Sequence, residues 1–328
     1  MKPSILPRLR CPACRGSAPF EMQVEVEAEG EVRTGQLRCS GCGAIFWITD
    51  FIPRFVPADN YAQNFGFQWN LFRTTQLDSA SGLTLSRDRF LKQSGWDALD
   101  GVSVLDAGCG AGRFAEVALS LGAEVFALDY SGAVDACWKN LGSHPRLHVV
   151  QADVYAVPFQ ADCFDCVYSF GVLQHTPDPE KALKSLARHL KPGGRLCVDI
   201  YLKHWKSLLD VKYWLRPITR RVSQRGLFRL IERCAPGLLA LSRRVRRIPG
   251  GTLSSRLIPI ADYEGVHPLN EVQRLQWAIL DTFDRLAPRY DQPQTPGTLR
   301  RCLDEAGLVD VEVFRQGVLV GRGQRRGG

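Results

Sequence analysis

The pattern of apolar and polar positions along the middle of the chain predicts strands that alternate with helices. Short apolar runs indicate buried strands over 102–105, 124–128, 146–151, 164–170 and 195–201. Apolar residues at helical spacing follow the first strand, at 115–121, and precede the fifth, at 179–190. A helix over 296–306 and two short strands, 309–314 and 318–320, close the chain. This alternation predicts a doubly wound α/β fold with a mostly parallel sheet.

A glycine-rich turn follows the first strand. Asp106 stands at the end of the strand, and Gly108, Gly110 and Gly112 come at every second position before the helix. Glycines let the backbone approach a ligand closely, and the amide groups at a helix start face that ligand. The turn therefore indicates a nucleotide-type binding crevice, although a lone glycine-rich turn is a weak signal.

Acidic residues at the ends of the next two strands narrow this interpretation. Asp129 ends the second strand and can accept hydrogen bonds from both hydroxyls of a ribose, as it would in a dinucleotide enzyme. The glycines, however, run G-x-G-x-G directly after an aspartate, not G-x-G-x-x-G. Asp153 follows the third strand and can reach an adenine amino group, and GVLQHTPDP follows the fourth at 171–179.

These four signatures, with LKPGGRL at 190–196, resemble the class I S-adenosylmethionine (SAM) methyltransferases, in the branch of the small-molecule and quinone methyltransferases. The resemblance covers residues 101–201. It implies SAM as cofactor and a seven-stranded sheet whose seventh strand runs antiparallel between the fifth and sixth. The cofactor-binding residues that it implies are Asp106, Gly108, Gly110, Gly112, Asp129, Asp153, Val154 and Gly171.

His175, within the segment after the fourth strand, is the candidate catalytic residue. An imidazole titrates near neutral pH, so it could take a proton from a hydroxyl or amine of the substrate. The alternative is that His175 lines the SAM site or braces its loop, since the same histidine occurs in relatives with different substrates.

Two cysteine pairs near the start of the chain have the spacing of a metal site. Cys11 and Cys14, and then Cys39 and Cys42, form a C-x2-C…C-x2-C pattern, with short strands expected over 22–28, 33–38 and 44–48. This pattern is typical of a tetrahedral four-thiolate Zn²⁺ site, which is structural because no coordination position stays open. The segment FWITDFIPRFV, 46–56, resembles the end of Trm112-like zinc ribbons, which often accompany methyltransferases.

The predicted domain organisation is a zinc ribbon over 1–56, an aromatic linker over 57–100 and a SAM-dependent methyltransferase domain over 101–328. The linker is either a helix packed on the sheet or a lid over the cofactor, with Gln68 and Trp69 facing the pocket. A further helix is expected to begin at Ser86 as its N-cap. A helical cap is expected as an insertion over 203–290, and a polar loop with Tyr290, Asp291 and Gln294 follows it near the active site.

Positive charge is concentrated in this insertion. Residues 212–247 hold eleven Lys or Arg and one acid, whereas the whole chain has a net charge of +8, so the rest of the chain is about −2. This segment could meet an anionic substrate, the surface of a membrane or RNA, or it could be a cap whose arginines are solvated or paired with the body.

The sequence thus predicts methyl transfer to a small-molecule, glycan or lipid-linked acceptor. Two alternatives stay open, an rRNA or tRNA base methyltransferase and a non-catalytic partner with a SAM fold. No N-P-P-Y-type tetrad follows the fourth strand, which argues against the first, and the intact set of glycines and acids argues against the second. The start, MKPSILPRLR, has no apolar signal core, so a cytoplasmic protein is expected.

Overall fold

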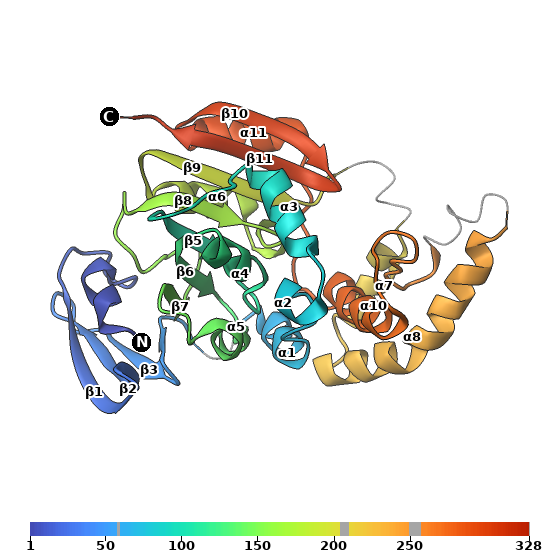
Figure 1. The fold of residues 1–328 in the computed structure, drawn as a ribbon, viewed down its shortest axis with the longest axis horizontal. Coiled ribbons are helices and arrows are strands. Elements are labelled where there is room, and N and C mark those ends of the chain that lie inside the picture. Colours follow the sequence, from blue (N-terminus) through green and yellow to red (C-terminus); the bar gives the residue numbers. More distant parts are fainter. Residues whose placement is uncertain (58–59, 204–209, 249–256, 328) are drawn as a thin grey trace.

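The structure is a computed structural model, and it describes residues 1–57, 60–203, 210–248 and 257–327 (Figure 1). The predicted linker and the predicted insertion over 203–290 therefore include short segments, 58–59, 204–209 and 249–256, that lie outside the described residues.

The centre of the fold is a sheet covered by helices on both faces (Figure 1). Seven of its strands have the order β7-β6-β5-β8-β9-β11-β10, and β11 runs antiparallel between β9 and β10, as the resemblance implied. Their bounds are β5 Ser103–Ala107, β6 Glu124–Asp129, β7 Leu147–Gln151, β8 Phe164–Ser169, β9 Leu190–Ile200, β10 Leu308–Gln316 and β11 Val318–Arg325. Every residue of β5 and β7 is buried, which explains why these strands are nearly continuous apolar runs.

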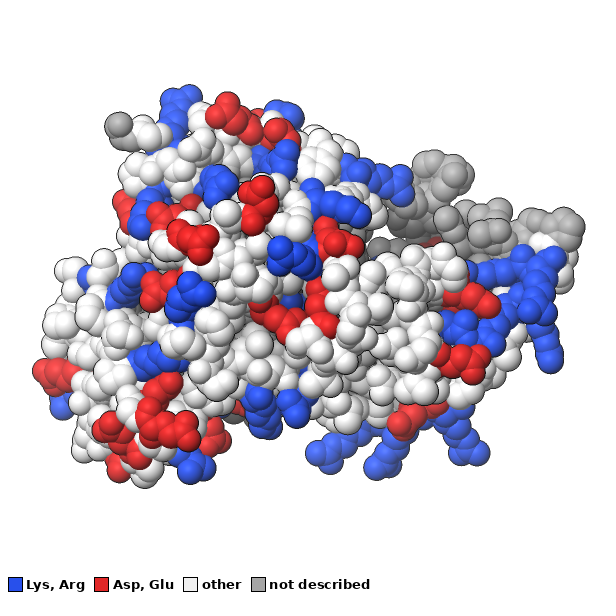
Figure 2. Space-filling model, viewed as in Figure 1, with Lys and Arg blue, Asp and Glu red and all other residues white. Residues whose placement is uncertain are grey.

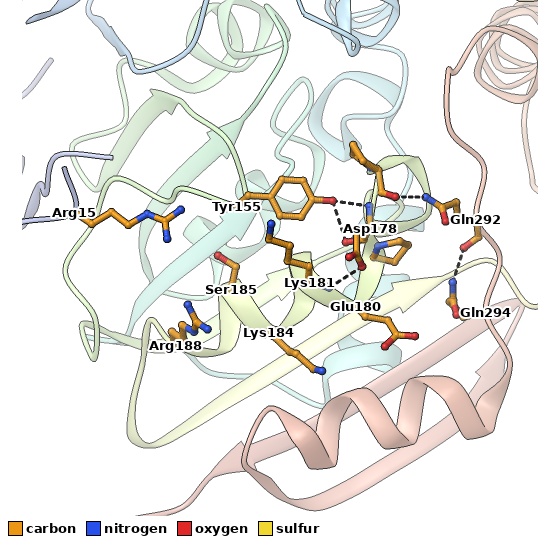
Figure 3. A pocket seen from close by; sticks show the side chains of 12 residues that line it. Arg15, Tyr155, Asp178, Glu180, Lys181, Lys184, Ser185, Arg188, Gln292 and Gln294 are labelled. Carbon is orange, nitrogen blue, oxygen red and sulfur yellow. Dashed lines mark hydrogen bonds between the residues drawn. The ribbon is translucent and has the colours of Figure 1, made fainter. Parts of the chain in front are cut away.

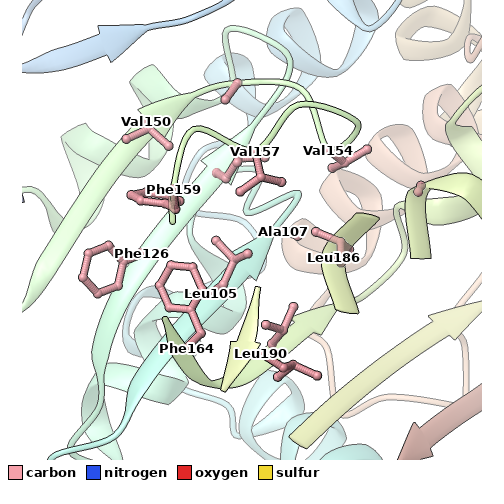
Figure 4. Close-up of a cluster of buried hydrophobic side chains, with 14 of the residues drawn as sticks. Leu105, Ala107, Phe126, Val150, Val154, Val157, Phe159, Phe164, Leu186 and Leu190 are labelled. Carbon is pink, nitrogen blue, oxygen red and sulfur yellow. The ribbon is translucent and has the colours of Figure 1, made fainter. Parts of the chain in front are cut away.

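Two apolar clusters fix the helices to the two faces of the sheet. The first cluster joins Leu105 and Phe126 to Leu186 and Leu190 (Figure 4). The second joins alternate strand residues, such as Val104 and Val125, to Phe90 and Val117. Alternation along each strand therefore divides its side chains between the two cores. The helices concerned are α3 Leu85–Ser94, α4 Arg113–Ser120, α5 Val134–Leu141, α6 Pro179–Ala187 and α11 Pro296–Glu305.

The sheet has eleven strands, so the expected number of seven is wrong for the sheet as a whole. The additional strands come from the N-terminal segment, which begins with the 3₁₀ helix η1 Pro3–Arg8: β1 Phe20–Ala28, β2 Glu31–Cys39, β3 Ile45–Thr49 and β4 Ile52–Arg54. Strand β4 pairs in parallel with β7, and the guanidinium of Arg54 donates to Gln151 Oε1 at 2.9 Å and to Asp135 Oδ1 at 2.7 Å. The edge of a sheet has unpaired backbone groups, and here the edge strands β4 and β7 pair with each other.

A helical cap lies at the other end of the molecule from these N-terminal strands (Figure 1). It comprises α7 Val211–Thr219, α8 Gln224–Arg246 and α10 Glu271–Leu286. Leu227, Ile231 and Leu239 of α8 pack on Ile279 and Phe283 of α10, and α10 in turn contacts α1, Gln63–Leu71, and so joins the cap to the core. No helix in the described ranges combines the length and the apolar character that crossing a membrane requires.

The helix after the linker does not begin as expected. The N-cap of α3 is Thr84, and the carboxylate of Asp78, on the short helix α2 Asp78–Ser81, accepts the backbone N–H groups of Ser86 and Arg87 at 2.9 and 2.8 Å. The Ser86 hydroxyl instead donates to the carbonyl oxygen of Gln76 at 2.9 Å. A capping group supplied by an earlier turn of the chain thus replaces the local cap.

Candidate active site

The predicted glycine turn joins β5 to α4 at the carboxyl edge of the parallel strands. Gly108, Gly110 and Gly112 have φ values of 90°, 53° and 91°, in the left-handed region that favours glycine. The N–H groups of Gly108 and Cys109 donate to the carbonyl oxygen of Leu128, at 2.6 and 3.0 Å, and so tie the turn to the end of β6. A Cβ atom at position 108 would lie 2.2 Å from a methyl group of Val172, so no larger residue fits.

Asp129, the last residue of β6, lies against this turn. Its Oδ2 accepts the N–H of Gly110 at 3.0 Å, and its Oδ1 accepts the N–H and the hydroxyl of Ser131 at 2.8 and 2.7 Å. Burial raises the pKa of Asp129, and the hydrogen bonds from Ser131 and Gly110 oppose this shift. The carboxylate is thus held in one orientation at the edge of the sheet, with lone pairs left for a ligand.

The other predicted acids lie at the same edge. Asp106 is 2% exposed, and burial raises its pKa to about 8, against the effect of the nearby Tyr168 hydroxyl. Asp153 follows β7 and accepts the N–H of Tyr155 at 2.9 Å. Val154 differs, since its side chain packs in the first apolar cluster (Figure 4), so only its backbone could face a ligand.

Gly171, at the end of β8, completes the predicted set. Its φ is 75°, and its N–H donates to Asp199 Oδ1 at 2.5 Å. A Cβ atom at this position would meet no atom of the described residues within 4 Å. Gly171 therefore borders open space, where a ligand could approach the backbone.

Helix α1 covers the glycine turn. A Cβ atom at Gly66 would lie 2.9 Å from the backbone of Gly132, and one at Gly110 would lie 3.2 Å from the ring of Trp69. Asn70 donates to the carbonyl oxygen of Gly132 at 2.8 Å. Gln68 of the same helix is 1% exposed. This helix of the aromatic linker therefore covers the glycine turn, which is the position that a lid would have.

Several buried polar groups of α1 and of the segment after β8 lack hydrogen-bond partners in the described part of the chain. Within the described part of the chain, Gln68 and Gln174 have no hydrogen-bond partner for either side-chain amide atom. Asn64 Nδ2 and His175 Nε2 also have none there. Burying an unsatisfied polar group costs about 1–3 kcal/mol, so their concentration indicates a place for a polar ligand. This is the fit expected if a cofactor and a substrate fill the space between α1 and the ends of the strands.

His175 lies in the 3₁₀ helix η2, Leu173–His175, and is 6% exposed. Its Nδ1 lies 3.0 Å from the carbonyl oxygen of Tyr290. Because a carbonyl oxygen only accepts, Nδ1 must carry the hydrogen, and Nε2 of the neutral ring then holds the lone pair. The rings of Phe65 and Tyr201 lie 5.2 and 5.6 Å from the imidazole and hold it in place.

Sequence reasoning missed an acidic face of α10 that lies near His175. Asp281 accepts from Tyr263 and from Gln76 Nε2, and burial raises its pKa to about 6. Asp284 accepts the Tyr201 hydroxyl at 3.4 Å, and burial raises its pKa while His175 and Lys212 lower it. Figure 2 shows acidic side chains in the hollow between the core and the cap. The i,i+3 spacing of two aspartates in an amphipathic helix was the available signal.

The polar loop after α10 reaches the site, as predicted. Besides the Tyr290 carbonyl, the Gln292 N–H donates to the carbonyl oxygen of Gln174 at 2.8 Å. Asp291 pairs with Lys212 of α7 at 2.8 Å, and both side chains are buried. The first charge of the basic segment is therefore part of the wall of the site.

A surface groove of about 640 Å³ lies beside the site, between the first cysteine pair and α6 (Figure 3). Most charged side chains that line this groove already contact other groups of the protein. Asp178 caps α6, Lys184 pairs with Glu305 at 2.5 Å, and Lys181 lies over the ring of Tyr155. It shares no residue with the predicted cofactor set.

The four predicted metal ligands form one cluster. The sulfur atoms of Cys11, Cys14, Cys39 and Cys42 all lie within 4.8 Å of one another. The distances from Cys11 to Cys42 and from Cys14 to Cys39 are 3.7 and 3.8 Å. Tetrahedral Zn–S bonds of about 2.3 Å place neighbouring sulfurs about 3.8 Å apart, so the cluster fits this ion.

Comparison with known proteins identifies similarity in the central part of the chain. Residues 105–198 match a family model described as a methyltransferase domain. The chain is 32% identical over 113 residues to the ubiquinone biosynthesis O-methyltransferase of Coxiella burnetii. It is 38% identical over 100 residues to the demethylmenaquinone methyltransferase of Clavibacter sepedonicus. The match shows, for residues 105–198, the similarity to a methyltransferase domain that the sequence motifs led us to expect.

The similarity is confined to part of each protein. The two alignments cover 34% and 30% of this chain and 48% and 40% of the relatives, so the chain spans half the length of these relatives or less. Among solved structures, phosphoethanolamine N-methyltransferase 2 of Haemonchus contortus in complex with SAM is 16% identical. That likeness covers 72% of this chain and 39% of the other, with a TM-score of 0.42.

Proposed function

We propose that the protein is a SAM-dependent methyltransferase that acts on a small-molecule, glycan or lipid-linked acceptor. The observation that carries the proposal is the contact of Asp129 with the N–H of Gly110, beside the glycine turn of a domain that matches methyltransferases. This contact joins a ribose-binding acid to a turn through which a ligand can reach the backbone.

The chain's own residues divide the binding of SAM among them. Asp129 would accept the ribose hydroxyls, and the backbone of 108–112 would face the methionine part. Asp106 would hold the amino group of that part, whose positive charge would stabilise the ionised form of Asp106. Asp153 and the backbone of Val154 would hold the adenine, and Gly171 would border the transferred group. When bound, SAM supplies an electrophilic methyl group for an in-line displacement.

His175 acts as the general base in this proposal. Nδ1 keeps its hydrogen on the Tyr290 carbonyl, so Nε2 takes the proton from a hydroxyl of the acceptor. The imidazolium that results lies near Asp284, whose negative charge stabilises it. Helix α1 would limit the access of water to the histidine, because the ring of Phe65 lies 5.2 Å from the imidazole.

The identity of the acceptor would depend on parts of the chain that the matched family model does not cover. The matched segment, 105–198, holds the proposed cofactor residues, whereas α7, α8 and α10 lie outside it. We therefore do not assign a quinone acceptor to this chain from its relatives, because a cofactor site and a fold do not fix the substrate.

We also propose a structural Zn²⁺ at the four cysteines. Four thiolates leave no open position for a substrate, and the ion would connect the two turns that flank β1 and β2. Because the ion would hold these two separate turns together, metal binding would supply part of the folding free energy of this segment.

Calorimetric titration of the full-length protein with S-adenosylhomocysteine and, separately, with NAD⁺ tests the proposed function. We expect saturable binding of S-adenosylhomocysteine at one site and none of NAD⁺. Transfer of labelled methyl from SAM is then screened in cell extracts with and without ribonuclease. Loss of labelling after ribonuclease would indicate an RNA acceptor, and binding of NAD⁺ alone would contradict the proposal.

A further inference from the structure

A second cavity, of about 660 Å³, lies between the start of α1 and the turn that joins α7 to α8. It is lined by three guanidinium groups, those of Arg220, Arg221 and Arg289. It lies outside the predicted cofactor set and outside the segment that matches the methyltransferase domain.

The positive charge in this cavity is not compensated by the protein. Some cations of the basic segment have acidic partners, as Lys212 has Asp291 at 2.8 Å and Arg246 has Asp262 at 3.5 Å. Arg220, Arg221 and Arg289 form no ion pair with any residue that the structure describes, and Arg289 lies over the ring of Tyr290. Three unmatched guanidinium groups around one cavity favour an anion.

A buried amide supplies an independent indication of a ligand. Asn64 lines the same cavity and is 3% exposed, and its Nδ2 has no partner among the described residues. This nitrogen can only donate hydrogen bonds. Leaving it unsatisfied is unfavourable, so an acceptor oxygen from a ligand would remove that cost.

The start of α8 adds further donors. Ser223 and Gln224 line the cavity, and the hydroxyl oxygen of Ser223 accepts the N–H of Gly226 at 3.2 Å. The N–H groups of Gln224 and Arg225 have no helix carbonyl to bond with, because they belong to the first turn. The positive end of the dipole of a 23-residue helix therefore points at this cavity.

We propose that this cavity binds a phosphate or diphosphate group of the methyl acceptor, an inference that rests on the proposed function. Three guanidinium groups exceed what one carboxylate would neutralise, and they suit an anion with several oxygens and more than one charge. The cavity and the proposed base both meet the start of α1, where Asn64 lines the cavity and Phe65 contacts His175. An anionic group held here would anchor one end of an acceptor whose other end reaches Nε2 of His175.

Calorimetry with inorganic pyrophosphate, on the full-length protein, tests the site. The variant Arg220→Gln/Arg221→Gln should raise the Kd for pyrophosphate about tenfold or more, because it removes two charge-assisted contacts. The matched control, Arg229→Gln/Arg233→Gln, removes the same charge from exposed positions of α8 outside the cavity and should leave the Kd within about twofold. Equal weakening of pyrophosphate binding by the two double variants would overturn the inference, because it would indicate general electrostatic attraction and no specific site.

A second variant and a second probe complete the test. Asn64→Leu keeps the net charge, and it should also weaken pyrophosphate binding while the thermal melting profile stays cooperative. Sedimentation with phosphatidylcholine vesicles that contain phosphatidic acid distinguishes a lipid phosphate from a free phosphorylated acceptor. Vesicle binding that requires Arg220, Arg221 and Asn64 supports the first, and pyrophosphate binding alone supports the second. Absence of binding in both arms overturns the site.

Titration of the same proteins with S-adenosylhomocysteine separates this inference from the proposed function. We expect Arg220→Gln/Arg221→Gln to bind S-adenosylhomocysteine as the wild type does. Binding of S-adenosylhomocysteine without binding of pyrophosphate would refute the anion site alone. Failure of the wild type to bind S-adenosylhomocysteine would refute the proposed function instead.

Discussion

Replacement of Asp129 by alanine tests the proposed ribose contact directly. The carboxylate accepts one N–H from Gly110 and two donors from Ser131, and it would accept two ribose hydroxyls besides. Hydrogen bonds to a charged group contribute about 1.5–3 kcal/mol each. The donors of Gly110 and Ser131 become free in the variant and can bind the ribose oxygens in part, so we take the lower end, about 3 kcal/mol in total. That corresponds to a rise of about 150-fold in Kd.

The assay is calorimetric titration with S-adenosylhomocysteine, with circular dichroism to verify the fold. The matched control is Asp135→Ala, which removes the same charge from α5 and breaks the ion pair with Arg54 at 2.7 Å, but leaves the glycine turn intact. We expect its Kd to stay within about twofold of the wild type. A folded Asp129→Ala protein with an unchanged Kd would refute the reasoning, as would an equal loss of affinity in Asp135→Ala.

Three further predictions concern the base, the buried acid and the metal. His175→Gln should lower kcat about 100-fold or more and leave the Kd for SAM nearly unchanged. The control His189→Gln removes a histidine that is bonded to the Gln160 carbonyl, and it should leave kcat unaltered. Equal kcat values in the two variants would contradict the role of His175. Burial raises the pKa of Asp106 to about 8, so this carboxyl binds its proton more tightly in the ligand-free folded protein than in the unfolded chain. The free energy of unfolding should therefore fall as pH rises from about 4 to about 8. Urea unfolding of Asp106→Asn should show a smaller decrease than the wild type, and identical slopes would count against this assignment. Purified protein should contain one Zn²⁺ per chain by mass spectrometry of the metal. Cys14→Ala should lose the ion together with thermal stability, whereas the control Cys234→Ala, at an exposed cysteine of α8, should retain it. Full metal content in Cys14→Ala would exclude the four cysteines as the Zn²⁺ site.

Local patterns were sufficient to predict the central fold because its signals are short in range. The strand over 103–107 is buried on both faces, and the glycines after it adopt φ values that other residues avoid. The carboxyl ends of parallel strands meet at one edge, so the contact between Asp129 and Gly110 follows from the order of the strands. The four cysteines needed only their spacing.

The features that sequence reasoning missed depend on contacts between distant parts of the chain. The pairing of β4 with β7 extends the sheet to eleven strands, and it depends on Arg54 reaching Gln151. Asp78 replaces Ser86 as the group that caps α3 because α2 folds back on it. The i,i+3 spacing puts Asp281 and Asp284 on one face of α10, but the place of that face in the fold depends on the contact between α10 and α1.

A crystal structure of the protein with S-adenosylhomocysteine tests the central claim most directly. Our account predicts the adenosine between the ends of β6 and β7, its ribose hydroxyls on Asp129, and the sulfur beside Gly171 and beneath α1. Density for the ligand at any other place, or a ribose without contact to Asp129, would contradict it.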